Sequence, residues 1–344
     1  MSRRYLFFVH QPYSLAILRP LQAAIRARGG ESAWFFHGAG ADHLLPDERY
    51  LDSIEAIKAF RPDAVFVPGN WVPDFIPGLK VQVFHGLETK NPKDHFRIRG
   101  LFDLYCTHGP FTTERFQALA ERHKHFFVAE TGWPKIDPLF APEDAAQPSY
   151  RRSNRPRILY ASTFTRSLTS APWLADQIAA LAESGDLDWL VTLHPKMDPE
   201  VVARYKALEG PHLRYVETDD VLPLLKVADV MVSDTSSIVF EFLMLDKPVV
   251  TLRNMKPGPH LIDIQTPSEL PTALARALQP EEARLRAIRA FCNYVHPYRD
   301  GRSSERILDA VDRSLSTQAS LRHKPPNVWR RLQMRARFRY YRLR

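Results

Sequence analysis

The sequence is poor in cysteine and in long apolar runs, and each shortage excludes a class of protein. Only two of the 344 residues are cysteine, Cys106 and Cys292, and they lie far apart without any metal-ligand spacing. We therefore exclude a disulfide framework and a cysteine-based zinc site, and we expect two buried thiols in a reducing compartment. No run approaches the roughly 18 apolar residues of a membrane span, and Tyr5 to Val9 is too short for a signal-peptide core. These absences favour a cytoplasmic protein.

Acidic residues are missing from residues 321–344, which hold nine of the chain's 47 Lys and Arg residues. The rest of the chain has the remaining 38 basic residues against 39 acidic ones, so the net charge of +8 is a property of the tail. Because the near-neutral body offers no basic groove, we do not expect nucleic acid as a partner.

The tail itself has the pattern of an interfacial helix. One helical stripe is formed by Trp329, Leu332, Ala336, Tyr340 and Leu343. Arginines flank this stripe, and such a helix places its apolar side in the headgroup layer and its cations against anionic lipid. The expected membrane contacts are Trp329, Arg330, Arg331 and Arg335. Solvated disorder of the tail is the alternative.

Short β-branched and aromatic runs alternate with helical patterns through the body, which is typical of βαβ units and parallel sheets. In the first half, the expected strands are Tyr5 to Val9, Ala33 to Phe36, Ala64 to Val67, Val81 to Phe84, Leu104 to Thr107 and Phe126 to Val128. In the second half, they are Arg157 to Ala161, Trp189 to Leu193, Leu213 to Val216, Val230 to Ser233 and Val249 to Leu252. The proline-rich stretch Ala141 to Pro156 has the composition of a linker.

The sequence thus predicts an α/β protein with two doubly wound, Rossmann-like domains that face a central cleft. We place the N-terminal domain at residues 1–140, the linker at 141–156, the C-terminal domain at 157–316 and the basic tail at 317–344. Because such folds bind ligands at the carboxyl ends of their strands, residues that directly follow strands are the best site candidates.

Three polar motifs follow expected strands, and one of them has the composition of a phosphate site. The motifs are His85-Gly86, His194-Pro195 and Ser233-Asp234-Thr235-Ser236-Ser237. A diphosphate could accept hydrogen bonds from Ser236, Ser237 and the free N–H groups at the following helix start, although a plain helix cap is the alternative. Glu241 lies among apolar neighbours and needs a partner such as a ribose diol or a basic side chain.

His85 and His194 are the best candidates for acid-base chemistry, because imidazole changes charge near neutral pH. A lone histidine at a strand end is more often structural, so this interpretation requires both rings to point into one cleft. Further candidates are Gly86, His108 and Asp234. The lone Gly38-Ala39-Gly40 does not support a dinucleotide fingerprint. Without a Cys/His cluster, we expect no bound metal, no metal requirement and no tightly bound cofactor.

The order of several motifs carries a family resemblance over roughly residues 80–310. These motifs are HG (His85-Gly86), TGWPKID (Thr131 to Asp137), RILYASTF (Arg157 to Phe164), LHPK (Leu193 to Lys196), ADVMVSDTSSIVFEFLMLDKPVV (Ala228 to Val250) and DGRSSERI (Asp300 to Ile307). Together they resemble the CDP-glycerol glycerophosphotransferase family, the teichoic-acid primases and polymerases and their relatives in surface-polysaccharide synthesis. The resemblance implies a GT-B-like fold, with CDP-glycerol on the C-terminal domain and the acceptor on the N-terminal one.

The resemblance also implies roles for individual residues. His85 matches the general base that deprotonates the acceptor hydroxyl, and His194 matches the histidine that contacts the diphosphate. The implied phosphate and nucleotide contacts are Thr163, Ser236, Ser237 and, for the ribose, Glu241. The implied reaction is attack of a hydroxyl on the β-phosphorus of CDP-glycerol with release of CMP. From the basic tail we expect it to take place at the inner face of the membrane, beside a lipid-linked acceptor.

Three positions depart from the family pattern around the donor segment. Thr235 stands where the family usually has Tyr, and Ser162 where it usually has Pro. Thr165 replaces an Arg, and Arg166, one place later, is the candidate to reach the diphosphate instead. A related polyol phosphate therefore remains a donor candidate. A GT-B glycosyltransferase or epimerase that uses a sugar nucleotide is the alternative enzyme, and a non-catalytic membrane or nucleic-acid binder is a lower one.

Overall fold

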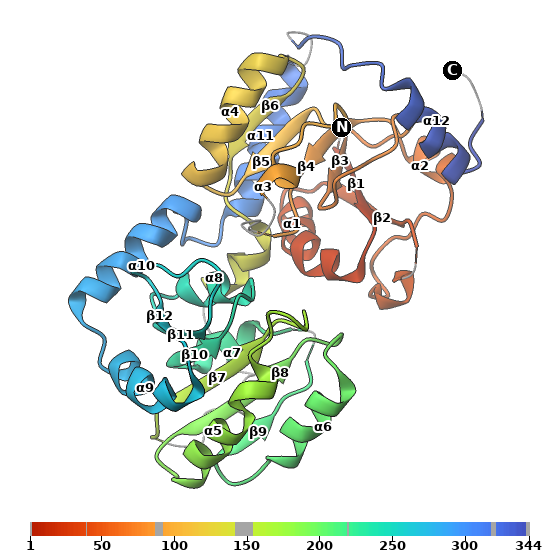
Figure 1. The fold of residues 1–344 in the computed structure, drawn as a ribbon. Coiled ribbons are helices and arrows are strands. Elements are labelled where there is room, and N and C mark those ends of the chain that lie inside the picture. Colours follow the sequence, from red (N-terminus) through yellow and green to blue (C-terminus); the bar gives the residue numbers. More distant parts are fainter. Residues whose placement is uncertain are drawn as a thin grey trace. The chain divides into compact units, whose positions relative to one another are not determined.

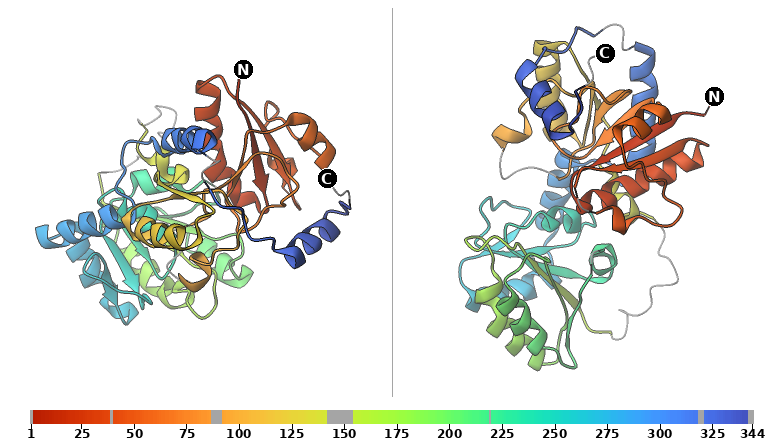
Figure 2. Two further views of the ribbon diagram at one scale, coloured as in Figure 1. Left: turned by 90° about the horizontal axis from the view of Figure 1, so that it is seen from above. Right: turned by 90° about the vertical axis from the view of Figure 1, so that its right-hand side faces the viewer.

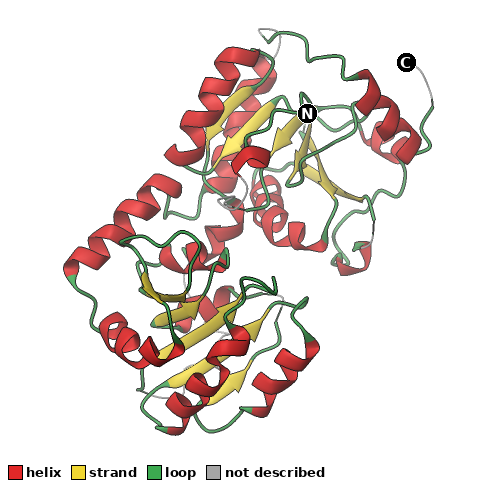
Figure 3. Ribbon diagram, in the orientation of Figure 1, coloured by secondary structure: helices red, strands yellow, loops and turns green. Residues whose placement is uncertain are grey.

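The computed structural model describes residues 2–38, 40–86, 92–141, 154–218, 220–317 and 321–341. The chain forms two compact units: unit 1 comprises Met1–Phe140 with Val295–Arg344, and unit 2 comprises Ala141–Tyr294. Each unit contains one six-stranded sheet in which all neighbouring strands are parallel (Figure 1). Helices alternate with strands along the chain (Figure 3). The predicted fold class, with two doubly wound Rossmann-like domains, is confirmed.

Unit 1 has the strand order β2-β1-β3-β4-β5-β6, with the reversal between β1 and β3. Its strands are β1 (Arg4–Val9), β2 (Glu31–Phe36), β3 (Ala64–Val67), β4 (Leu79–Gln82), β5 (Leu104–Thr107) and β6 (Phe127–Glu130). Its helices are α1 (Leu15–Ala27), α2 (Ile54–Phe60), α3 (Pro92–His95), α4 (Pro110–His123), α11 (Ser303–Thr317) and α12 (Val328–Arg337). Strand β4 begins two residues before the expected one and ends at Gln82, which places His85 in the loop beyond it.

Both faces of the unit 1 sheet are covered, so its strands are almost continuously apolar. Leu6 and Phe8 of β1 point to one face, where they share a core with residues of α2, α4 and α12. The alternate residues of β1 are also buried, and α1 and α11 contact each other and the rest of the unit. Figure 2 shows these helices around the sheet.

The chain returns to unit 1 after unit 2, and this differs from the predicted boundary at residue 316. Helix α10 (Glu282–Val295) ends at the boundary, and residues 295–344 belong to unit 1. Helix α11 has a buried apolar stripe that contacts strands of the unit 1 sheet. Of the predicted linker, residues 142–153 lie outside the described residues.

Unit 2 has the strand order β12-β11-β10-β7-β8-β9, with the reversal between β7 and β10. Its strands are β7 (Arg157–Ser162), β8 (Asp188–Leu193), β9 (Leu213–Tyr215), β10 (Val230–Ser233), β11 (Val249–Leu252) and β12 (Ile262–Ile264). Its helices, besides α10, are α5 (Ala171–Glu183), α6 (Pro199–Ala207), α7 (Leu222–Val227), α8 (Ile238–Leu243) and α9 (Leu270–Leu278). Helices α5, α6 and α9 share one core with Ile158 and Tyr160 of β7.

Both cysteines are buried free thiols, as expected. Cys106 lies on β5, where burial raises its pKa. The Cys292 thiol of α10 donates a hydrogen bond to the Leu243 carbonyl oxygen of α8 at 3.3 Å. Both therefore serve packing. Within the described residues, we find no helix long and apolar enough to cross a bilayer.

The tail does form a helix, but the residues of its predicted apolar stripe do not share one environment. Helix α12 ends at Arg337, and Met334 and Tyr340 are buried in the unit 1 core. The Tyr340 ring stacks on Phe75 at 4.5 Å between centroids. Trp329 and Leu332 are exposed, at 74% and 54%.

Arg335, an expected lipid contact, faces the protein in this structure. It bonds to the Asp74 carboxylate at 3.3 Å and lies over the Phe75 ring. Its side chain is 18% exposed. Arg331 lies 3.9 Å from the same carboxylate, and Arg330 donates to the Arg99 carbonyl oxygen at 2.6 Å. The arginines on this side of α12 hold the helix to the protein.

Candidate active site

His85 lies just past β4, on the carboxyl side of the unit 1 sheet. Its side chain is exposed, and its Nδ1 lies 3.2 Å from the carbonyl oxygen of Pro68 in the loop after β3. Because a carbonyl only accepts, Nδ1 carries the hydrogen in the neutral ring and Nε2 keeps its lone pair. Among the described residues, a methyl group at Gly86 would meet nothing within 4 Å. This is the tautomer that a general base requires.

The structure places His108 in the core of unit 1 rather than at a ligand site. It is fully buried, and its ring lies 5.3 Å from that of Phe84 and 5.5 Å from that of Trp133. Burial holds the pKa of His108 well below its usual range, so the ring is neutral. We assign this buried ring a packing role.

In unit 2, three of the predicted segments meet at one edge of the sheet. They follow β7, β8 and β10, which are neighbours in the order β10-β7-β8. The Thr163 amide after β7 donates to the Asp234 carboxylate after β10 at 3.0 Å. The ring of Phe164 lies 4.4 Å from that of His194, which follows β8. The parallel topology therefore brings together Thr163, His194 and the serine-rich loop.

Asp234 organises this edge instead of facing a ligand. Its fully buried carboxylate also accepts from the Ser170 amide at 2.9 Å and from the Ser170 hydroxyl at 3.1 Å. Burial raises its pKa, and these hydrogen bonds oppose the shift. The carboxylate thus fixes the loop from Thr163 to Ser170 against the serine-rich segment.

The two serines lie at the start of α8, as predicted. Ser237 is exposed and directly precedes the helix, and its side chain makes no capping hydrogen bond. Ser236 beside it is half-buried. Hydroxyls and amide groups at a helix start suit a phosphate oxygen. Glu241, one turn further along, is buried at 3% exposure.

His194 is poised as a neutral hydrogen-bond donor. Its Nδ1 accepts from the Lys196 amide at 3.0 Å, so Nε2 carries the hydrogen. Burial, together with the Lys196 charge, lowers the pKa of His194. Lys196 itself is exposed, with its Nζ 5.9 Å from the centre of the Phe164 ring. A donor and a cation therefore stand together beyond β8.

Arg166 lies at the surface, where its partner is a carboxylate. Its side chain is 90% exposed and bonds to the Asp198 carboxylate at 3.0 Å. Such an exposed ion pair contributes little to stability, so the guanidinium can exchange Asp198 for a stronger anion at small cost.

Three residues that the sequence did not single out contribute to this edge. Phe164 and Lys196 flank His194, and they lie inside the motifs RILYASTF and LHPK. Asn254, beyond β11, donates through Nδ2 to the Asp234 carbonyl oxygen at 2.8 Å. No sequence signal marks Asn254, because its role depends on the pairing of β11 with β10.

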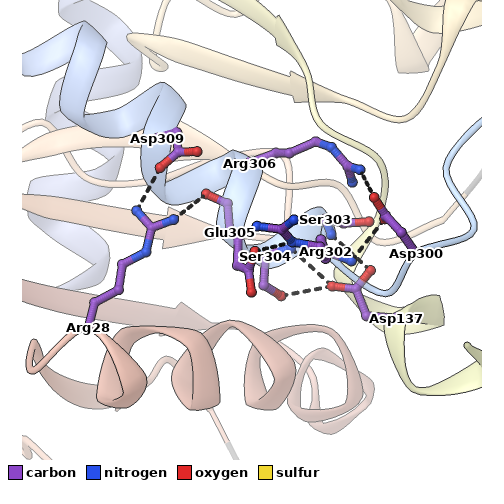
Figure 4. Close-up of polar contacts among 9 residues, drawn as sticks. All are labelled: Arg28, Asp137, Asp300, Arg302, Ser303, Ser304, Glu305, Arg306 and Asp309. Carbon is purple, nitrogen blue, oxygen red and sulfur yellow. Dashed lines mark hydrogen bonds and ion pairs between the residues drawn. The ribbon is translucent and has the colours of Figure 1, made fainter. Parts of the chain in front are cut away.

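Two motifs of the resemblance lock together inside unit 1. The Asp137 carboxylate of TGWPKID accepts from the backbone amides of Ser303 and Ser304 at 3.1 and 3.0 Å, at the start of α11 (Figure 4). It also accepts from the Ser304 hydroxyl at 3.1 Å. A carboxylate at a helix N-terminus satisfies free amides and complements the helix dipole. TGWPKID and DGRSSERI are thus joined as a structural clasp, although Asp137 and Ser303 lie 166 residues apart in the sequence.

Gly132 and His296 complete this clasp. The Trp133 amide donates to Nε2 of His296 at 2.9 Å. Gly132 has a φ of 81°, and a side chain there would come within 2.5 Å of the Ser303 hydroxyl and 2.9 Å of His296. Only glycine fits this close approach without strain.

Across the ranges that the structure describes, no group of three or more His, Cys, Asp or Glu side chains is placed to hold a metal ion. The cationic and hydrogen-bonding groups at the unit 2 edge are the available partners for a diphosphate.

Comparisons with known proteins agree with the motif order. Residues 85–254 match the model of the family described as CDP-Glycerol:Poly(glycerophosphate) glycerophosphotransferase. The teichoic acid glycerol-phosphate primase of Bacillus subtilis (strain 168) is 27% identical over 209 residues, which cover 55% of this chain and 52% of that protein. The chain therefore spans about half the length of the curated relative that it matches.

Solved structures share the fold. A putative UDP-N-acetylglucosamine 2-epimerase from Listeria monocytogenes is similar with a TM-score of 0.69 and 17% identity, covering 92% of this chain and 97% of that one. The wall teichoic acid polymerase TagF, soaked with CDPG, has a TM-score of 0.66 and 16% identity, covering 92% and 89%. At this identity the likeness supports the GT-B-like fold alone.

Proposed function

We propose that the protein transfers glycerol phosphate, or a related polyol phosphate, from its CDP-activated form to a hydroxyl group of a surface-polymer acceptor. The premise is the match of residues 85–254 to the model of the CDP-glycerol:poly(glycerophosphate) glycerophosphotransferase family. The observation that carries the proposal is the exposed His85 ring, whose Nδ1 is held by the Pro68 carbonyl and whose Nε2 is left as a base. It stands at the first residue of the family match.

The proposed step is a phosphoryl transfer. The acceptor oxygen forms a bond to the β-phosphorus, while the bond from that phosphorus to the bridging oxygen breaks and CMP leaves. Nε2 of His85 takes the proton of the acceptor hydroxyl. Such a transfer demands little covalent chemistry from the protein, so positioning and charge stabilisation dominate. A general base contributes about 10² to 10⁴-fold.

Unit 2 supplies the proposed donor contacts. In the proposal, the Nε2 hydrogen of His194 and the Lys196 ammonium stabilise charge on the diphosphate, together with Ser236 and Ser237 at the start of α8. Arg166 is a further diphosphate contact, and Glu241 a ribose contact. The hydrogen bonds of the Asp234 carboxylate support these contacts, because they fix the backbone of the loops that carry them. No bound metal is needed to neutralise the diphosphate in this scheme.

We also propose that the protein works at the inner face of the membrane, beside a lipid-linked acceptor. The support comes from the outer side of α12, where Trp329 and Leu332 are exposed. Exposed apolar side chains beside arginines suit the headgroup layer of an anionic membrane. Because α12 is held by Asp74 and the core, this contact uses a fixed helix rather than a loose tail.

The test is CMP release from CDP-glycerol with a soluble acceptor. We expect turnover by the wild-type protein and a loss of at least about 100-fold in His85→Ala. His43→Ala is the matched control, because His43 is exposed in the same unit and far from the proposed chemistry in sequence. A panel of sugar nucleotides tests the epimerase and glycosyltransferase alternative. Turnover of sugar nucleotides alone would refute the proposal.

A further inference from the structure

Helix α12 and the loop after β3 border an open cavity on unit 1, and Arg99 alone among its lining residues lies within the family match. Its volume is about 340 Å³, and it is lined by Asn70 and Trp71 of the loop, by Arg99, and by Arg330, Gln333 and Arg337 of the helix. This volume falls within the range of small-molecule sites, about 300 to 1,000 Å³. None of the described lining residues is acidic.

The positive charge of this cavity is only partly compensated. Arg99 is paired with the Asp94 carboxylate at 2.5 Å. In the part of the chain that the structure describes, Arg330 and Arg337 have no ion pair: Arg330 donates to the Arg99 carbonyl oxygen, and the Arg337 guanidinium lies 4.9 Å from the centre of the Trp71 ring. Two cations thus face the same space without a carboxylate.

This positive charge helps to lower the pKa values of neighbouring groups. Burial, Arg99 and Arg97 together lower the pKa of Arg330. Burial, His37 and Arg337 lower the pKa of His10 to about 3, so His10 adds no charge of its own. Like charges gathered in a partly buried space oppose folding unless an anion offsets them.

The cavity also adjoins the segment that holds the proposed base. The loop from Pro68 to Trp71 contributes two lining residues, and its Pro68 carbonyl binds Nδ1 of His85. Its position is fixed by close packing, because a side chain at Gly69 would come within 2.5 Å of the His10 ring. A ligand in the cavity is therefore placed on the same loop as the base.

We propose that this cavity binds a phosphodiester, with Arg330 and Arg337 as its cationic contacts and the amides of Asn70 and Gln333 for neighbouring hydroxyls. Arginine suits this task because its planar fork matches phosphate oxygens. The inference rests on the proposed function, in which an acceptor built of polyol phosphate carries such diesters, and it makes α12 part of the acceptor site. An anionic phospholipid headgroup carries the same group, so the experiment separates the two sources.

The test compares two full-length double variants that remove the same charge. Arg330→Gln with Arg337→Gln changes the cavity, whereas Arg322→Gln with Arg339→Gln removes two exposed arginines of the same tail that do not line it. Binding of a soluble glycerol phosphate trimer is measured by calorimetry without any nucleotide. Binding to phosphatidylglycerol and phosphatidylcholine vesicles is measured by sedimentation. Circular dichroism and thermal unfolding confirm folding, and Arg330→Lys with Arg337→Lys keeps the charge if the glutamine pair does not fold.

We expect the cavity variant to weaken trimer binding at least about tenfold, and the control variant to stay within about twofold. If the trimer does not bind and only the cavity variant loses phosphatidylglycerol vesicles, the diester is that of a lipid headgroup. Equal weakening in both variants, or none in either, overturns the inference. CDP-glycerol turnover is assayed separately. If turnover is absent but the trimer binds, the proposed function alone is refuted. If turnover is present but the two double variants bind the trimer equally, this inference alone is refuted.

Discussion

Acidification should destabilise unit 1 through His296. This ring is 1% exposed, and its Nε2 accepts a hydrogen bond from the Trp133 amide at 2.9 Å. Burial lowers its pKa to about 4; Arg306 adds to the shift, while Asp300 opposes it. A protonated Nε2 cannot accept, so protonation removes the Trp133 bond and leaves a buried charge.

The direction of this pH effect on stability depends on whether the folded or the unfolded chain binds the proton at higher pH. The unfolded chain has a histidine pKa of about 6.5 and binds the proton first, so the stabilising contribution is present above that pH and is lost as the pH falls toward about 4. Between about pH 7 and about pH 4.5, this single group should lower the free energy of unfolding by about 2 kcal/mol.

The assay is urea unfolding at both pH values, together with an NMR titration of the His296 ring. His296→Gln is the control, because its amide oxygen can still accept from Trp133 but does not titrate. The wild type should lose about 2 kcal/mol more than this variant on acidification. A His296 pKa above 6, or equal losses in both proteins, would refute the reasoning.

Three further predictions concern the donor edge, the tail and metal ions. Asp234→Asn should lower the free energy of unfolding by about 2 to 4 kcal/mol, because the Thr163 and Ser170 amides lose a charged acceptor. It should also raise KM for CDP-glycerol. Urea unfolding and steady-state kinetics measure the two effects, and no change in either value would contradict the prediction. Trp329→Ser with Leu332→Ser should weaken binding to phosphatidylglycerol vesicles about tenfold, whereas Met255→Ser, at an exposed apolar residue of unit 2, should have no effect; equal losses would argue against membrane contact by α12. Activity should persist in EDTA, and its loss with recovery in Mg²⁺ would show that a metal is required.

The sheets could be predicted from the sequence because their signal is local. Ala64–Val67, Leu104–Thr107, Val230–Ser233 and Val249–Leu252 were expected to the residue, since buried parallel strands are short apolar runs with clear ends. Strand β12 (Ile262–Ile264) was not predicted, because Asp263 interrupts its apolar run. Its place at the sheet edge comes from pairing with β11.

The site was predictable at strand ends and not beyond them. Thr163, His194 and Ser237 follow strands that topology makes neighbours, so a local pattern located them. His108 has the same local pattern but is buried, because the rings of Phe84 and Trp133 cover it. Whether a polar residue at a strand end meets solvent or core depends on long-range packing, which no spacing in the sequence encodes.

Packing changes the interpretation of the tail's positive charge more than that of any other feature of the sequence. Counted along the sequence, the arginines of α12 form a uniform basic face. In the structure they divide into two groups: Arg331 and Arg335 pair with the Asp74 carboxylate, whereas Arg330 and Arg337 turn toward the cavity with Arg99. A membrane would be attracted by all of them at long range, but only unpaired arginines in a shaped space can recognise one phosphate group. If α12 acted only as a lipid anchor, there would be no reason for its arginines to differ, and the two double variants would behave alike.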